Sequence, residues 1–204
     1  MSGAWVFVCG LSGAGKDSVI AWARDCLAGH GDVVFSQRWL TRPTPAGADH
    51  QGMDPAPFAR LRDSGGLAWH WEAHGFHYGV GARYARQVGW GRVVVVNGSR
   101  EHVAGLHADP KLRVVQVVAD PMEVAQRLSR RGREGPEGIA SRLARNARLG
   151  PVGADLLISN DGALAEAGQR LANYLVGLAA ASNVPHAPIR PGSHASFARP
   201  SNSE

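Results

Sequence analysis

Short runs of apolar residues alternate with segments of helical spacing along most of this chain. The strands that these runs predict are 5–9, 33–35, 67–71, 76–80, 93–96, 113–119 and 156–158. The helices that the spacing predicts are 17–28, 56–62, 82–88, 121–131, 139–149 and 164–180. The run at 93–96 is apolar at every position, which indicates burial on both faces of a parallel sheet. The order of elements therefore predicts a three-layer α/β fold with right-handed crossovers.

Two stretches lack this periodicity. Residues 41–57 are rich in Pro, Gly and Asp, so we expect a loop or a small excursion there. Residues 181–204 are rich in Pro and Ser and contain few large apolar residues, which predicts a disordered tail. The pattern thus assigns one domain to residues 1–180 and a tail to the remainder.

The composition narrows the choice of partners. The 204 residues suffice for one domain with a sizeable core. The sequence has no long apolar run and no secretory signal, and Cys9 and Cys26 are isolated, so we expect a cytoplasmic protein that does not bind membranes. The formal charge of +5 is not gathered into one basic run, and no nucleic-acid-binding motif occurs. The charge favours a small anionic substrate over nucleic acid, and the oligomeric state, monomer or dimer, stays open.

The strongest local pattern is Gly-Leu-Ser-Gly-Ala-Gly-Lys at residues 10–16, which fits the phosphate-loop motif G-x-x-x-x-G-K between a predicted strand and a predicted helix. Its glycines let backbone N–H groups turn toward phosphate oxygens, and the helix N-terminus adds positive potential. Lys16 would reach the β- and γ-phosphates of ATP. A chance match in a glycine-rich chain is the alternative. One of only two lysines stands at this position, which favours a nucleotide site.

The loop departs from the motif at its end. Ser or Thr, whose hydroxyl binds Mg²⁺, usually follows the lysine, whereas this chain has Asp17 and then Ser18. The strand at 93–96 is followed by Asn97, where many phosphate-loop enzymes carry an acidic residue. We therefore expect Asp17 to take the metal ion itself or to hold one of its water molecules, and to supply the negative charge that Asn97 lacks.

Segments that carry polar chemistry follow three predicted strands, at 10–18, 97–100 and 159–161. Parallel strands end at the same edge of a sheet, and ligands of such folds bind there. The spacing therefore predicts a single site that these three segments share.

From the phosphate loop onward, residues 4–178 resemble the guanylate-kinase family. The matching pieces are residues 10–18, Leu-Thr-Arg-Pro at 40–43, Gly-Phe-His-Tyr-Gly at 75–79, the arginine-rich stretch 127–133, Arg142-Leu143 and Asn160-Asp161. Within that family the chain is most similar to the branch that phosphorylates ribose 1,5-bisphosphate to 5-phosphoribosyl 1-diphosphate in phosphonate degradation. The signs of this branch are residues 15–18, 41–42, 78–81, 96–100 and 132–134.

Departures from the true guanylate kinases agree with this branch. Tyr78-Gly79 is followed by Val80 instead of Thr, so one hydroxyl donor to a base is missing. The second arginine after the Thr-Arg pair is also missing, with Pro45 near its place, and Arg38 is the candidate replacement. A site without hydrogen-bond partners for guanine loses discrimination for it. The resemblance thus implies a site that recognises phosphate groups and does not recognise a base.

The resemblance assigns residues to three tasks: binding ATP, binding the acceptor, and catalysis. For ATP it implies Gly10, Leu11, Ser12, Gly13, Ala14, Gly15, Lys16, Asp17, Ser18, Arg131, Asn160 and Asp161. For the acceptor, in a region of about 38–90, it implies Arg38, Arg42, Tyr78, Asn97 and Arg100. For catalysis it implies Lys16 and Arg42 together with Arg133 and Arg142, which belong to a lid of about 130–148. ATP and Mg²⁺ are the implied cosubstrate and metal ion.

Other interpretations stay open from the sequence. A kinase acting on GMP or a related nucleotide would share the loop and the lid. A guanylate-kinase-like module without activity, which binds a protein partner, is the alternative from another class. His70, His74 and His77 are close in sequence, but no Cys or fixed ligand spacing accompanies them, so we do not expect a metal site there.

Overall fold

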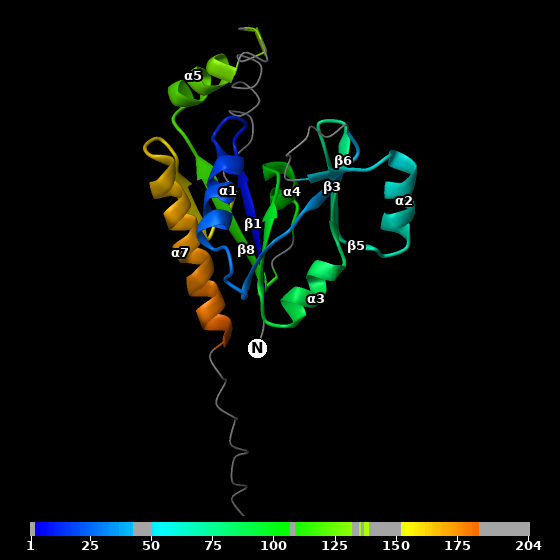
Figure 1. Ribbon diagram of the computed structural model, residues 1–204. Coiled ribbons are helices and arrows are strands. Elements are labelled where there is room, and N and C mark those ends of the chain that lie inside the picture. The colour runs from blue at the N-terminus through cyan, green and yellow to red at the C-terminus, as the bar shows by residue number, and fades with distance from the viewer. Residues whose placement is uncertain are drawn as a thin grey trace, which may run out of the picture.

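The computed structural model describes residues 3–42, 50–106, 109–131, 135, 137–138 and 152–183. Its main sheet has five strands in the order β2-β7-β1-β8-β9 (Figure 1). Their bounds are β1 Ala4–Gly10, β2 Val33–Phe35, β7 Val93–Asn97, β8 Leu112–Val118 and β9 Leu156–Ser159. All four neighbouring pairs are parallel. The predicted parallel α/β fold is therefore confirmed.

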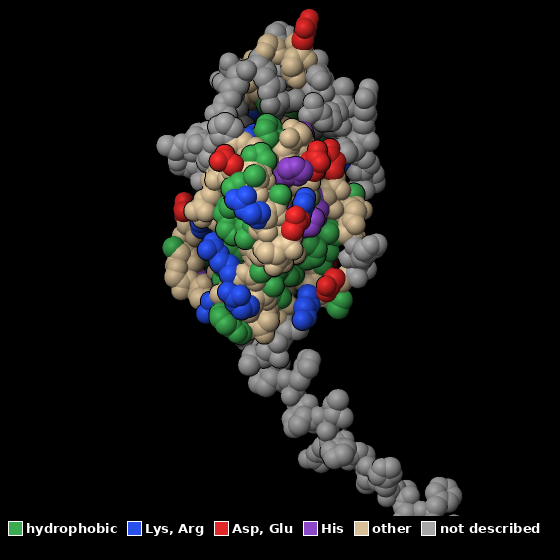
Figure 2. Space-filling model, turned by 90° about the vertical axis from the view of Figure 1, so that its right-hand side faces the viewer, with side chains coloured by type: hydrophobic (Ala, Val, Ile, Leu, Met, Phe, Trp, Pro, Cys, Tyr) green, Lys and Arg blue, Asp and Glu red, His purple; other side chains and the backbone are tan. Residues whose placement is uncertain are grey.

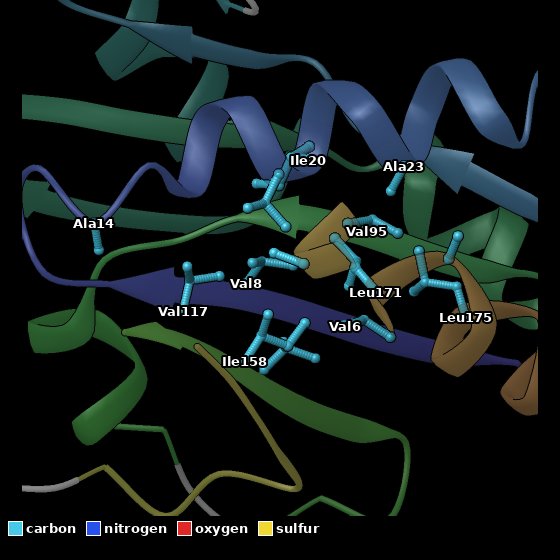
Figure 3. Close-up of a cluster of buried hydrophobic side chains, with 14 of the residues drawn as sticks. Val6, Val8, Ala14, Ile20, Ala23, Val95, Val117, Ile158, Leu171 and Leu175 are labelled. Carbon is cyan, nitrogen blue, oxygen red and sulfur yellow. The ribbon is translucent and has the colours of Figure 1, made fainter. Parts of the chain in front are cut away.

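Helices cover both faces of this sheet because its strands are apolar on both. On one face, Val6, Val8 and Val95 pack against helices α1 (Lys16–Cys26) and α7 (Leu164–Asn183), as Figure 3 shows. Helix α5 (Pro121–Arg131) adds Val124 and Leu128 to the same core. On the other face, Phe7 and Val96 pack with residues of α3 (Arg83–Gly89) and α4 (Arg100–Ala104). Two cores thus fix the central strands β1 and β7.

A second sheet stands beside the main one, to the right in Figure 1. Its order is β4-β3-β6-β5, with β4 parallel to β3 and the other pairs antiparallel. The elements are β3 Arg38–Leu40, β4 His50–Gly52, α2 Pro55–Asp63, β5 Leu67–Ala73 and β6 Phe76–Gly81. His74 and Gly75 both have positive φ, 55° and 73°, which is the backbone of a tight hairpin turn. Trp71, Ala73 and Val80 place this sheet on the core that Phe7 and Val96 form.

Three expectations from the sequence need correction. Residues 50–52 form strand β4 inside the segment expected to be a loop, because pairing with β3 uses backbone groups and two of the three side chains stay exposed. Residues 100–104 form the short helix α4, which the sequence pattern had not indicated. Helix α7 continues to Asn183, three residues into the expected tail, where Ser182 Oγ donates to the Leu178 carbonyl. Residues 184–204 and most of the expected lid lie outside the described residues.

Within the described ranges, no helix is long and apolar enough to cross a membrane. On the face that Figure 2 presents, basic, acidic and histidine side chains are interspersed with apolar ones and do not form one charged patch.

Candidate active site

The phosphate loop leaves β1 at Gly10 and enters α1 at Lys16. Gly13 and Gly15 have φ values of 92° and 83°, a left-handed backbone that favours glycine. A Cβ at Gly13 would lie 2.8 Å from Val124 Cγ1 of α5, and one at Gly10 would lie 2.5 Å from the Val117 carbonyl oxygen. The loop is therefore pressed against α5 and β8, and no side chain fits at these glycines.

Lys16, Asp17 and Asn97 form a hydrogen-bonded triangle at the end of the loop. Lys16 Nζ donates to Asp17 Oδ1 over 2.7 Å and also to Asn97 Oδ1. Asn97 Nδ2 donates to the same oxygen of Asp17 over 2.9 Å. Asn97 is 4% exposed, so β7 holds the base of the triangle, whereas the Asp17 side chain is 78% exposed and faces solvent. Two of the three predicted polar segments thus meet, as the spacing of the sequence indicated.

The charges around Asp17 favour its ionised form. Loss of solvation by itself raises the pKa of the carboxyl, but the Lys16 ammonium and the bonds from Lys16 and Asn97 outweigh it, and the pKa falls well below the usual range. The Arg38 guanidinium of β3 acts in the same direction. An ionised, exposed carboxylate next to an amide oxygen is a set of oxygen ligands that suits Mg²⁺.

Asn160, which follows β9, supports the loop from the other side. Its Nδ2 donates to the Ala14 carbonyl over 2.8 Å, and a Cβ at Gly15 would collide with the same amide. Asn160 is 5% exposed, so its amide group acts as a brace for the loop backbone. The third predicted polar segment is thus brought to the loop. A direct contact between Asn160 and ATP stays a prediction.

Arg127 of α5 joins this side of the site, and the sequence had indicated no role for this residue by itself. Its Nη2 donates to the Asn160 carbonyl over 2.8 Å, and its Nη1 would lie 3.8 Å from a Cβ at Gly15. Glu123, one turn earlier, lies 3.7 Å from the same guanidinium. The sequence signal for this role was the spacing of Glu123 and Arg127, one turn apart on a predicted helix. The same spacing is equally typical of an ion pair on the protein surface.

Asp161 joins the ends of two strands. Its Oδ1 accepts from the Asp120 backbone N–H, and its Oδ2 accepts from Ser159 Oγ. The Ser159 bond, followed by the Asp120 bond, lowers the pKa of the carboxyl. Asp161 thus ties the end of β8 to the end of β9, and its predicted contact with the nucleotide stays a prediction.

The predicted acceptor arginines lie on or beside the second sheet, each over an aromatic ring. The Arg38 guanidinium lies 5.7 Å from the centre of the Tyr78 ring, and that of Arg42 lies 6.0 Å from the centre of the Phe76 ring. Thr41 fixes the chain between them, because its N–H donates to the His77 carbonyl and its Oγ1 accepts from the His77 N–H. Phe76 and Tyr78, which are two residues apart in β6, thus support Arg42 and Arg38.

Arg100 begins helix α4 and is 6% exposed. Ser99 caps that helix by accepting from the His102 N–H over 3.1 Å. Burial raises the pKa of the Cys9 thiol to about 11, although the charges of Arg100 and Lys16 oppose this shift. Arg100 is thus a buried cation at the start of α4, and its predicted contact with the acceptor stays a prediction.

Three predicted residues of the lid cannot be placed. Arg133 and Arg142 lie outside the described residues, and so does the side chain of Arg131 at the end of α5. In the part of the chain that the structure describes, no group of three or more His, Cys, Asp or Glu residues could hold a metal ion. His77 stacks on Phe58 with ring centres 5.8 Å apart, so it serves packing.

Comparisons with known proteins give the family. The chain is 41% identical over 182 residues to a ribose 1,5-bisphosphate phosphokinase of Pseudofrankia inefficax, which covers 88% of this chain and 94% of that protein. It is 42% identical over 176 residues to the protein of that name from Methylobacterium radiotolerans, with 86% and 98% covered. The chain belongs to the ribose 1,5-bisphosphate phosphokinase family. This branch of the family is the one that the sequence predicted.

Other comparisons agree with the phosphokinase family. The protein of the same name from Rhizobium etli is 39% identical over 181 residues, with 87% of this chain and 92% of that protein covered. Among solved structures, guanylate kinase from Anaplasma phagocytophilum matches with a TM-score of 0.62 at 18% identity, covering 86% of each chain. That likeness shows the fold alone. No family model matches the chain.

Proposed function

We propose that this protein transfers the γ-phosphoryl group of ATP to ribose 1,5-bisphosphate, which gives 5-phosphoribosyl 1-diphosphate and ADP in phosphonate catabolism. The observation that carries the proposal is the similarity of about 40% identity to ribose 1,5-bisphosphate phosphokinases over nearly their whole length. The formed phosphate loop, with Lys16 at the start of α1, supports the kinase chemistry.

The chemistry asks little of the protein beyond position and charge. An oxygen of the C1 phosphate attacks the γ-phosphorus, a new P–O bond forms, and the bond to the bridging oxygen breaks with ADP as the leaving group. That nucleophile is already ionised near neutral pH, so no general base is needed. Catalysis then rests on alignment and on neutralising the negative charges of the two substrates. A site of arginines and one lysine suits this task.

The described residues divide this work. Lys16 is held next to Asp17 and Asn97 and would exchange these partners for the β- and γ-phosphate oxygens of ATP. Arg42 and Arg38 would bind the acceptor phosphates, because a guanidinium can make two parallel bonds to a phosphate group. Arg133 and Arg142 are proposed to close over the transferring group. Asn160 and Arg127 keep the loop in shape while the phosphates bind.

Mg²⁺ is part of this proposal, and the residues present fit it. Asp17 offers an ionised carboxylate at the solvent side of the loop, and Asn97 offers an amide oxygen from the end of β7. These two residues would hold the ion directly or through its water molecules. Bound there, Mg²⁺ would supply positive charge to the β- and γ-phosphates.

The alternative of a GMP-type kinase has less support from the site. Val80, which stands where guanylate kinases have Thr, is fully buried and belongs to the core next to Phe7 and Val96. It offers neither a donor nor an exposed surface to a base. The formed loop, with its lysine in place, gives no reason to prefer a module without activity.

The experiment offers ATP and Mg²⁺ with ribose 1,5-bisphosphate and, in parallel, with GMP, and follows ADP release and the phosphorylated product. We expect ribose 1,5-bisphosphate to be turned over with the higher kcat/KM. Faster turnover of GMP would replace the proposal with a nucleotide kinase. ADP formation with neither acceptor would favour a binding module.

A further inference from the structure

Four side chains from four elements stack face to face in one column. His102 of α4 stacks on Trp71 of β5, with ring centres 4.6 Å apart and planes 16° apart. Trp71 stacks on Tyr78 of β6 at 5.4 Å and 6°. The Arg38 guanidinium of β3 lies over the Tyr78 ring, 5.7 Å from its centre. The column therefore begins at the main core and ends at an arginine of the second sheet.

The strand register explains why the column is continuous. Trp71 is directly opposite Tyr78 across β5 and β6. Arg38 is opposite Val80 on the other side of β6, so it is the diagonal neighbour of Tyr78. Opposite and diagonal positions share one face of an antiparallel sheet, and a long side chain can reach a diagonal neighbour. A slip of the register by one residue would separate all of these contacts.

The inner end of the column is fixed by further aromatic contacts. The His102 ring lies 5.6 Å from the centre of Phe7 in β1 and 6.3 Å from the centre of Trp69 in β5. Phe7 is fully buried in the central strand that leads into the phosphate loop. The strand that carries the loop and the sheet that carries Arg38 are thus joined through these rings.

Three ring nitrogens in and beside this column make no hydrogen bond in the described part of the chain. Trp71 Nε1, Trp69 Nε1 and His102 Nε2 are all buried there without a hydrogen-bond partner. Burying such a group without a partner costs stability, so each case requires an explanation. For Trp71 and His102 the ring faces supply one, because Trp71 stacks with both His102 and Tyr78 and a smaller apolar side chain would not provide a flat face.

The outer end of the column is Arg38, whose guanidinium lies over the Tyr78 ring. Arg42, the other predicted acceptor arginine, lies over the Phe76 ring two residues earlier on the same strand, β6. We infer that the column of His102, Trp71 and Tyr78 positions Arg38 for the acceptor phosphate, with Trp71 and His102 as positioning residues. This inference rests on the proposed function, since it assigns Arg38 to the acceptor.

The inference also assigns Tyr78 a different task from the one expected from the sequence. The resemblance implied a contact between Tyr78 and the acceptor, which a hydroxyl donor would provide. In the column the ring face is what holds Arg38, because a cation over an aromatic face is attracted by the electrons of the ring. Tyr78→Phe keeps the face and removes the hydroxyl, so it separates the two tasks.

The test compares variants that keep a flat ring with variants that remove it: Trp71→Phe with Trp71→Leu, and His102→Phe with His102→Leu. Trp90→Leu is the matched control, because Trp90 is 66% exposed. The readouts are the KM values for ribose 1,5-bisphosphate and for ATP, kcat, the Tm, and the Kd of ribose 1,5-bisphosphate without ATP by calorimetry. We expect W71L and H102L to raise the acceptor KM and Kd about three- to tenfold, because a displaced Tyr78 ring would weaken its contact with the Arg38 guanidinium.

The same variants should leave the KM for ATP within about twofold, whereas W71F and H102F should stay close to the wild type for both substrates. Y78F should weaken acceptor binding less than W71L does, because it keeps the ring face. Equal changes in both KM values, or a lower Tm with unchanged acceptor binding, would show a role in packing only and overturn the inference. A large loss with Y78F would overturn it in favour of the hydroxyl. If W71L does not fold, the H102L and H102F pair decides.

Measurements on the wild type distinguish a failure of this inference from a failure of the proposed function on which it rests. If the wild type turns over ribose 1,5-bisphosphate and W71L and H102L bind it equally well, the column has no positioning role and the proposed function stands. If the wild type neither binds nor phosphorylates ribose 1,5-bisphosphate, the proposed function fails, and the inference fails with it.

Discussion

The Asn97 amide donates a 2.9 Å hydrogen bond to the carboxylate of Asp17, which joins two residues that are 80 positions apart in the chain. Asn97 is buried at the end of β7, and Asp17 is exposed in the first turn of α1. The bond places a carboxylate next to the amide oxygen that Lys16 also contacts. The acidic group of the site thus comes from the phosphate loop and is oriented from the neighbouring strand.

Asp17 is expected to set the response to Mg²⁺. Asp17→Asn keeps the shape but removes the charge, so we expect kcat to fall about tenfold or more, roughly the loss of one charged hydrogen-bonded contact. The Mg²⁺ concentration for half-maximal activity should rise in the same variant. Asp17→Ser restores the hydroxyl of the usual motif and should recover only part of the activity. Full activity of D17S with unchanged Mg²⁺ dependence would exclude the metal role of Asp17.

Lys16 is expected to be needed for turnover and not for folding. Its side chain is 17% exposed and now pairs with Asp17, and Lys16→Met keeps its length. We expect kcat to fall about 10²-fold or more, as for removal of a charge that stabilises the transition state. Lys111→Met is the matched control, since Lys111 is the other lysine and is exposed. An equal loss of kcat in both variants would contradict a catalytic role of Lys16.

Gly15 is expected to tolerate no side chain. Its φ is 83°, and a Cβ there would collide with the Asn160 amide. Gly15→Ala should therefore destabilise the protein by about 1–2 kcal/mol and raise the KM for ATP. The control is Gly177→Ala in α7, where a Cβ meets nothing within 4 Å and alanine favours the helix. Denaturant unfolding of both variants checks this, and a loss of stability in both alike would contradict the assignment.

His102 is expected to make stability depend on pH. Burial, with His70 adding to the effect, lowers the pKa of the His102 imidazole from 6.5 to about 4. Between these values the unfolded chain binds a proton that the folded chain does not, so stability falls as the pH drops from about 6.5 to about 4. His102→Phe should flatten this part of the stability curve, measured by urea unfolding at several pH values. His30→Gln, which changes an exposed histidine, should leave the slope as in the wild type.

Much of the fold could be predicted because its signals are local. The all-apolar run of β7 indicates burial on two faces, and the glycines around Lys16 indicate a loop that wraps phosphates. Strand β4 and helix α4 could not be predicted in the same way. The first is held by backbone bonds to β3, and the second follows from a cap at Ser99, and neither leaves a periodic apolar pattern.

The candidate site was likewise predicted in part. The three polar segments after strands were predicted to meet, and Asp17, Asn97 and Asn160 do meet around the loop. The role of Arg127 was not predicted, because its contacts to the Asn160 carbonyl and to Gly15 depend on how α5 packs against the loop. The roles of the lid arginines stay predictions.

The phosphate loop, the parallel α/β fold and the family could be recognised from the amino-acid order, because each depends on short motifs and local apolar patterns. The partners of those residues became known from the folded chain: Asp17 with Asn97, Asn160 with Ala14, and the column that joins His102 to Arg38. Such contacts depend on the register of strands and the packing of helices. These bring together atoms from segments between which the sequence shows no periodic relationship.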